Sequence, residues 1–162
     1  MPVDSSEPPL ERGPGADLEK RLAMVLDSER LGVLSTCGGQ QPYASLVAFS
    51  ATKDLAHLVF VTPRPTRKYA NLVTNTRVAI LIDNRSHRAS DFRRAMAATA
   101  IGTVHEVRKT KNSRLVRIYL GKHPELEDFL WSPTCALLDI RVEIYYVVQR
   151  FQHVTELHLR RS

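Results

Sequence analysis

Hydrophobic and polar positions repeat with two different periods along the chain. In residues 17–30 the apolar side chains recur at i, i+4, i+7 and i+8, which is typical of one face of an amphipathic helix. From residue 31 the pattern changes to alternation, in "LGVLST" and "PYASLVAFS", separated by the turn signal "CGGQQ". These segments predict a β-hairpin. A second turn, "ATKDLA", leads into a third predicted strand, "HLVFVT".

A helix beginning near Thr66 and two more strands are predicted next. The strand at 77–83, "RVAILID", has an apolar, β-branched centre, and the polar segment "NRSHRASD" after it reads as a loop. The segment "AATAIGTVHEV" alternates as a fifth strand, in which Gly102 indicates a bulge or a close approach of backbone.

The last third of the chain predicts two short helices and a strand-rich end. The apolar positions in 111–131 are interrupted near His123 and Pro124, which favours two helices over one. The segment "CALLDIRVEIYYVVQRFQHVTELHL" predicts one bent strand or two, broken near Arg150. Many strands with short connections and few helices predict a mainly β, α+β fold: an antiparallel barrel with peripheral helices, and not a doubly wound parallel sheet.

Composition and charge narrow the class of protein. With 162 residues, 43% of them hydrophobic, the chain predicts one domain over 17–162 and a flexible N-terminal tail over 1–16. The net charge of +6 favours an acidic or phosphorylated partner. Two cysteines outside any CxxC pair, and no apolar run near the roughly 20 residues that span a bilayer, predict a cytoplasmic protein without a membrane partner.

The stretch "VFVTPRPTRKYANL" carries a candidate anion site. Thr66 suits the N-cap of the following helix, and Arg67 and Lys68 come directly after it. A phosphate there would meet free helix amides, the positive end of the helix dipole and two cations. A solvated basic first turn is the alternative interpretation.

The order of elements and three segments resemble the pyridoxamine 5'-phosphate oxidase-like flavoproteins, the FMN-binding split β-barrels. The segments are "GVLSTCGGQQPYASLVAF", "LVFVTPRPTRKYANLVTNTRVAILI" and "AATAIGTVHEV". The resemblance covers nearly all of residues 18–159. It implies a split barrel that binds FMN, and a homodimer with the flavin between subunits. It also implies an oxidoreductase activity, in which flavin N5 exchanges hydride with a small organic substrate or a nicotinamide.

The resemblance also assigns residues to the cofactor. Thr66, Arg67 and Lys68 correspond to the run that grips the FMN phosphate. Asn71, one turn further on, either bonds the ribityl chain or stabilises the loop. The remaining positions border the flavin from two strands: Ser45, Leu46, Val47 and Ala48 on one, and Val61 and Thr62 on the other.

The resemblance fails at the positions where the family's namesake binds the phosphate of pyridoxine. A lysine and an arginine of its flavin strand correspond to Ser50 and Ser45 here. Its Tyr, Arg and Ser on a later helix correspond to Tyr119, His123 and Glu127. The chain thus lacks two of the cations that bind the substrate phosphate in the namesake. Because each charge-assisted bond contributes roughly 1.5–3 kcal/mol, their loss predicts that the protein is not a pyridoxal phosphate synthase.

Other classes of function stay open at this point. The same fold could hold haem or flavin as a carrier or sensor without turnover, or could use the deazaflavin F420 in place of FMN. A nucleic-acid-binding domain is disfavoured because the basic cluster "RSHRASDFRR" lacks interleaved aromatic residues. No pair of the 6 histidines has the spacing of a zinc site, so no metal site is predicted.

Overall fold

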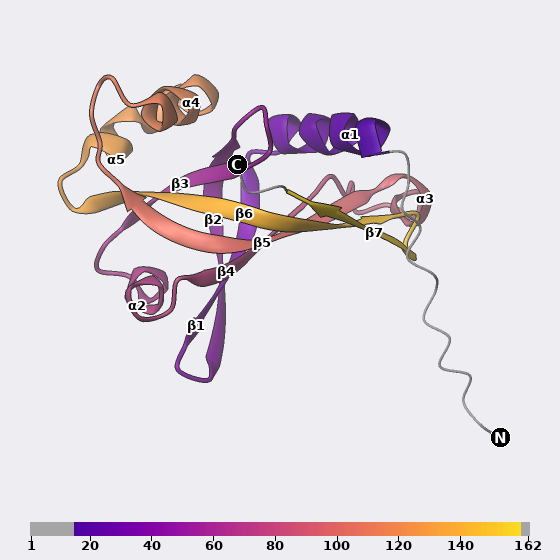
Figure 1. Ribbon diagram of the computed structural model, residues 1–162, viewed down its shortest axis with the longest axis horizontal. Helices are drawn as coiled ribbons and strands as arrows, with labels where there is room; N and C mark the ends of the chain where they lie inside the picture. The colour runs from indigo at the N-terminus through magenta and orange to yellow at the C-terminus, as the bar shows by residue number, and fades with distance from the viewer. Residues whose placement is uncertain (1–14, 160–162) are drawn as a thin grey trace.

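The antiparallel strands form one sheet that closes on itself. The structure is a computed structural model that describes residues 15–159. The strands are β1 (Leu31–Gly38), β2 (Gln41–Ala51), β3 (His57–Pro63), β4 (Arg77–Asp83), β5 (Met96–Val107), β6 (Cys135–Gln149) and β7 (His153–His158). Their order is β3-β2-β1-β4-β5-β6-β7, and β3 also pairs with β6. That extra pairing closes β1–β6 into a six-strand barrel, with β7 added to the edge of β6 (Figure 1).

Five α-helices lie around the barrel in the part of the chain that the structure describes. They are α1 (Gly15–Ser28), α2 (Arg67–Thr74), α3 (Asp91–Arg94), α4 (Arg114–Lys122) and α5 (Glu127–Trp131), with the short 3-10 helix η1 (Pro124–Leu126) before α5. In Figure 1, α1, α4 and α5 lie above the long strands β5 and β6, and α2 lies below them, beside the β1–β2 hairpin. The predicted fold class, mainly β with peripheral helices, is confirmed.

Most predicted elements are present, with two differences. The sequence segment predicted as a polar loop ends in the four-residue helix α3, which is too short to have a hydrophobic period. The C-terminal segment forms two strands, the second of the predicted alternatives, and they are separated at Arg150 and Phe151, whose φ angles are 50° and 67°. Of the predicted tail, residues 1–14 lie outside the described residues, and Gly15 and Ala16 belong to α1.

Two hydrophobic clusters hold the layers together. The larger one fills the barrel and includes the fully buried Leu34, Phe49, Ile80 and Tyr145. The buried face of α1 joins this cluster. The smaller one lies between β3, β6 and the helices α4 and α5, and its members are Val59, Val61, Val116, Tyr119, Leu130, Cys135 and Leu137. Because β3 is covered on both faces, its five central residues are all buried and it does not alternate.

Two lysines hold segment ends by donating to main-chain carbonyls. Lys109 Nζ donates to the carbonyls of Leu130, Ser132 and Cys135 at 2.7–2.9 Å. Lys122 Nζ donates to Leu26 at 2.7 Å and to Glu29 at 2.5 Å, at the end of α1. Burial lowers the pKa of Lys122 to about 8. These ammonium groups satisfy carbonyls that have no partner in a helix or strand.

Gly102 lies at an irregularity between β5 and β6. The register shifts between Ile101 and Gly102, as the sequence predicted. A Cβ atom built on Gly102 would lie 2.2 Å from the carbonyl oxygen of Arg141, so the two backbones approach too closely for a side chain. Both sequence interpretations of this glycine, a bulge and a close approach, are therefore correct.

We expect Gly102→Ala to lower the free energy of unfolding by about 2 kcal/mol or more, because rigid backbone of β6 must move to admit the methyl group. Gly121→Ala in α4 is the matched control. A Cβ there meets nothing within 4 Å, so the same change should stabilise the helix by about 0.5–1 kcal/mol. Urea unfolding of both variants measures this. Equal effects of the two substitutions would contradict the role given to Gly102.

Candidate functional site

Strands β2 and β3 are paired at one end and separate at the other. Three residue pairs join them: Phe49↔Phe60, Ser50↔Val59 and Ala51↔Leu58. Beyond Phe49 the ladder stops, although β2 extends back to Gln41 and β3 continues to Pro63. We call the resulting opening, bordered by residues 45–48 of β2 and 61–62 of β3, the split.

The two edges of the split differ in what they offer a ligand. Phe49 N–H donates to Arg30 on the β1 side, and Thr52 N–H donates to His57 on the β3 side. Alternation along β2 therefore directs the main-chain groups of Leu46 towards β3, and the ladder with β3 does not reach them. The opposite edge is held rigidly, because β3 pairs with β6 as far as Pro63. The split is defined by the six strand residues that the resemblance assigned to the flavin, and flavin contact at these positions stays a prediction.

The N-terminus of α2 lies just beyond the end of β3. Thr66 has an extended backbone (φ −131°, ψ 155°), and its hydroxyl accepts from Tyr69 N–H at 3.3 Å and donates to the Pro63 carbonyl at 2.8 Å. The predicted N-cap is thus confirmed. The amides of Arg67 and Lys68 find no acceptor among residues 15–159. A helix start with free amides favours an anion.

Arg67 and Lys68 carry no counter-charge among the described residues. The Arg67 guanidinium lies over the ring of Tyr43, 5.7 Å from its centre. Arg67 is exposed, but Lys68 is partly buried, and burial lowers the pKa of its ammonium group. Neither forms an ion pair with a carboxylate in the part of the chain that the structure describes.

A third cation near this helix is neutralised. Arg64 forms a 2.5 Å salt bridge with Glu106 of β5, and Tyr69 donates its hydroxyl to the same carboxylate at 2.8 Å. Burial opposes the charge of Glu106, but the bonds from Tyr69 and Arg64 outweigh it and lower the pKa of the carboxyl. Arg64 also donates to the carbonyls of Pro133 and Cys135. Sequence reasoning missed this network, because its members are far apart in the chain.

Asn71 connects α2 to the β1–β2 hairpin. Its side chain is buried, and Nδ2 donates to Thr36 Oγ1 of β1 at 3.0 Å. A Cβ on Gly38 would lie 2.3 Å from Asn71 Oδ1, so the hairpin approaches the helix closely at this point. The amide of Asn71 therefore positions α2 against β1. A bond to a ribityl chain stays a prediction.

Ser45 offers an unused polar atom beneath α2. Its hydroxyl is buried and has no hydrogen-bond partner, a state shared only with Ser50 and Tyr119 among the described side chains. Ser45 pairs with Leu34, and Thr36 pairs with Tyr43, so Ser45 and Thr36 are diagonal neighbours on one face of the hairpin. A buried hydroxyl without a partner is costly unless a ligand or a water satisfies it.

The positions that correspond to the namesake's substrate residues are mostly in the core. Tyr119 is fully buried, and burial raises the pKa of its hydroxyl to about 12. His123 is also buried and contacts the Phe49 carbonyl through Nε2 at 2.7 Å, and burial lowers the pKa of its imidazole. Glu127 is exposed. These residues do not gather into a site for a phosphate ester.

Two further features are absent from the described residues. No group of three or more His, Cys, Asp or Glu side chains is placed to hold a metal ion in residues 15–159. No helix within this range is long and apolar enough to cross a membrane.

We expect Asn71→Ala and Thr36→Val each to lower the free energy of unfolding by about 1–2 kcal/mol, because each leaves one partner of a buried hydrogen bond unsatisfied. The double variant should lose less than the sum of the two, because only one bond is removed. Chemical unfolding of the three variants measures the coupling. Strictly additive losses would show that the two side chains act independently.

Comparison with known proteins agrees with this architecture. The sequence profile of the family described as pyridoxamine 5'-phosphate oxidase matches residues 18–148. No curated protein sequence matches the chain.

Three solved structures share the fold. A heme binding protein from Mycobacterium smegmatis has a TM-score of 0.76 at 15% identity, over 86% of this chain and 57% of that one. The general stress protein 26 from Bacillus anthracis has a TM-score of 0.62 at 18% identity, over 88% and 98%. A FAD-binding protein from Mesorhizobium loti has a TM-score of 0.59 at 21% identity, over 79% and 91%. Because the family profile covers most of the sequence, the chain belongs to the pyridoxamine 5'-phosphate oxidase-like family, with its FMN-binding split-barrel fold.

Proposed function

We propose that this protein binds FMN at the split and acts as a flavin-dependent oxidoreductase on a small organic substrate or a nicotinamide. The observation that carries the proposal is the start of α2, where two free amides and two cations without carboxylate partners lie beside the opening between β2 and β3. A phosphomonoester dianion fits this combination of donors better than a neutral ligand does. Membership of a family that is often flavin-dependent supports the same choice.

The residues present fit the separate parts of FMN. Thr66, Arg67 and Lys68 would hold the phosphate, and the uncompensated charge of the partly buried Lys68 favours an anion beside it. The hydroxyl of Ser45, buried without a partner, offers a hydrogen bond under the same helix. The side chains of Leu46 and Ala48 would border the ring system, which is planar and largely apolar. The side chains of Val47, Val61 and Thr62 are buried, so these residues would border it with main chain only.

Bound flavin would supply hydride transfer at N5, so the chain itself needs no nucleophile. Its own residues bind, orient and exclude water. The side chains that border the split, from Ser45 to Ala48 and from Val61 to Thr62, include no group that could act as a general acid or base near neutral pH. Proton transfer would therefore fall to the substrate or to solvent.

The same residues argue against pyridoxal phosphate synthesis. Ser45 and Ser50 supply hydroxyls where the namesake has cations, and His123 is enclosed by the core with its Nε2 bonded to a carbonyl. We therefore propose a substrate without a phosphate group at that end of the flavin.

We also propose that the protein is a homodimer. One row of residues crosses the outer face of five strands, from Leu46 through Val33, Leu81 and Thr99 to Tyr146. Leu46 is 65% exposed and Tyr146 37% exposed, although both lie in the middle of strands. A mostly apolar row, with Leu46 and Tyr146 exposed at its two ends, favours an interface. A second copy seated there would also cover the split and keep water from a bound flavin.

The first experiment compares FMN with riboflavin, which lacks the phosphate. We expect wild-type protein to bind FMN at least roughly 100-fold more tightly, because two charge-assisted bonds contribute about 1.5 kcal/mol or more each. Arg67→Ala with Lys68→Ala should abolish this preference while the affinity for riboflavin changes little. Flavin fluorescence quenching measures both affinities.

The control is Arg93→Ala with Arg94→Ala on α3, which removes the same charge from exposed positions. It should retain the preference for FMN. An unchanged preference in the Arg67 and Lys68 double variant would refute the phosphate site. An absorbance spectrum of purified protein, with mass identification of any released group, separates FMN from F420 or haem. Nicotinamide oxidation by holoprotein separates an enzyme from a carrier.

A substitution that places a charge on the apolar row tests the proposed dimer interface. Leu46→Asp should raise the dissociation constant of the dimer roughly 30-fold or more, the effect of losing an interface contact worth about 2 kcal/mol. Met24→Asp on α1 is the control, since Met24 is 71% exposed and lies outside the row. Analytical ultracentrifugation reports both. A wild-type monomer, or a dimer unaffected by Leu46→Asp, would contradict the proposed interface.

A further inference from the structure

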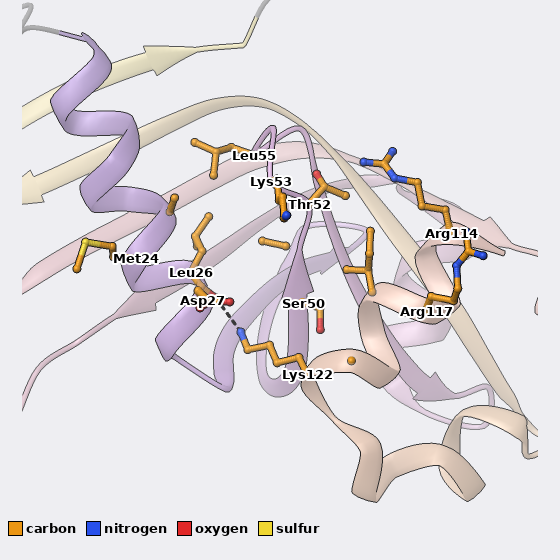
Figure 2. Close-up of a pocket in the computed structure, with 14 residues that line it drawn as sticks. Met24, Leu26, Asp27, Ser50, Thr52, Lys53, Leu55, Arg114, Arg117 and Lys122 are labelled. Atoms are coloured by element: carbon orange, nitrogen blue, oxygen red, sulfur yellow. Dashed lines mark hydrogen bonds between the residues drawn. The ribbon is translucent and has the colours of Figure 1, made fainter.

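A second pocket lies at the other end of β2 from the start of α2. It is bounded by α1, by the turn between β2 and β3, and by α4, and its volume is about 810 Å³. Figure 2 shows its lining side chains, which come from these three elements. None of residues 45–48, 61 and 62 lines this pocket, but Ser50 does. Because Ser50 corresponds to the lysine of the namesake's flavin strand, the pocket adjoins that end of the site proposed for the flavin.

The rim of this pocket is basic. Lys53 comes from the turn, and Arg114 and Arg117 come from successive turns of α4 (Figure 2). None of the three forms a salt bridge with a described residue. The only carboxylate in the lining is that of Asp27. The hydrogen bond from Thr52 lowers the pKa of the neighbouring Asp54 carboxyl, and the charge of Arg114 helps to lower it. Three cations that form no salt bridge around one cavity still favour an anionic ligand.

The floor of the pocket carries a polar group without a partner. Ser50 is 1% exposed, and its hydroxyl makes no hydrogen bond within the described chain. Beside it, the Lys122 ammonium group donates to the carbonyls of Leu26 and Glu29. These bonds join α4 to the end of α1, so Lys122 has a structural role in the pocket wall. A buried hydroxyl that faces a cavity is a ready hydrogen-bond donor.

The rest of the wall is apolar. Met24 and Leu26 of α1, Ile118 of α4 and Leu55 of the turn contribute apolar side chains to the lining. Apolar walls with a few convergent polar groups are the usual composition of a small-molecule site. Charge at the rim and a hydrophobic interior together select a ligand with an anionic head and a hydrocarbon body.

We infer that this pocket binds a small amphipathic organic anion, a carboxylate or phosphate ester with an apolar body, whose head lies between Arg114 and Arg117. Tyr119 and His123, which correspond to the namesake's substrate residues, lie on the opposite side of α4 and do not line it. The pocket thus meets the proposed flavin site only through Ser50, and anion binding between Arg114 and Arg117 does not require a bound flavin.

The test compares 4-phenylbutyrate with its neutral amide, 4-phenylbutanamide, by calorimetric titration of the full-length protein. The acid should bind about tenfold more tightly or better, since one charge-assisted bond separates the two probes. Arg114→Gln with Arg117→Gln should remove that difference. Arg93→Gln with Arg94→Gln on α3, equal in charge change, should not. Phenyl phosphate, tested alongside, shows which anionic head is preferred.

Backbone NMR locates the bound probe. Binding at the proposed site should shift the amide signals of Ala51 and Gly121, which line the pocket, and leave that of Leu46 unchanged. Equal affinity for the acid and the amide, no saturable binding of either, an equal loss in both double variants, or shifts centred on Leu46 would each overturn the inference. Because flavin binding is measured separately, failure here leaves the proposed function untouched.

Discussion

Closure of the barrel through β3 is the constraint on which the other features depend. Seven residue pairs tie β3 to β6, from His57↔Arg141 to Pro63↔Cys135, whereas only three tie it to β2. Strand β3 therefore stays paired with β6 as far as Pro63, whereas its pairing with β2 stops at Phe49. Pro63 and Pro65 keep the exit extended until Thr66 starts α2. The opening and the helix start beside it are thus two consequences of one pairing pattern.

The local electrostatics follow from where a single carboxylate lies. Arg64, Arg67 and Lys68 fall within five positions of each other, yet Glu106 neutralises only Arg64. That pair, with Tyr69, braces the base of α2 against β5. The two remaining cations share the free amides of the helix start. A carboxylate one residue further along β5 would face the other side of the sheet, so the strand period itself limits the acid to its structural role.

Much of this could be predicted from the sequence, and the exceptions have a common cause. The alternation of apolar and polar residues predicted the strands. Thr66 predicted the start of α2, because capping depends on local sequence. Gly102 predicted the close approach of β5 to β6, because only glycine tolerates backbone atoms at that distance. The Asn71–Thr36 bond and the Glu106 network each depend on segments more than 30 positions apart. The pocket between α1 and α4 was missed for the same reason, since no local pattern brings those helices together.

The distribution of positive charge distinguishes this chain from the namesake of its family. Ser45 and Ser50 stand where the namesake has cations on the flavin strand, and both hydroxyls are buried without partners. The cations are found instead on helices at the two ends of β2: Arg67 and Lys68 on α2, Arg114 and Arg117 on α4. A charge at a helix start attracts an anion at that end of a ligand. The strand surface is left without charge, which suits the flat ring and the phosphate-free substrate that we propose.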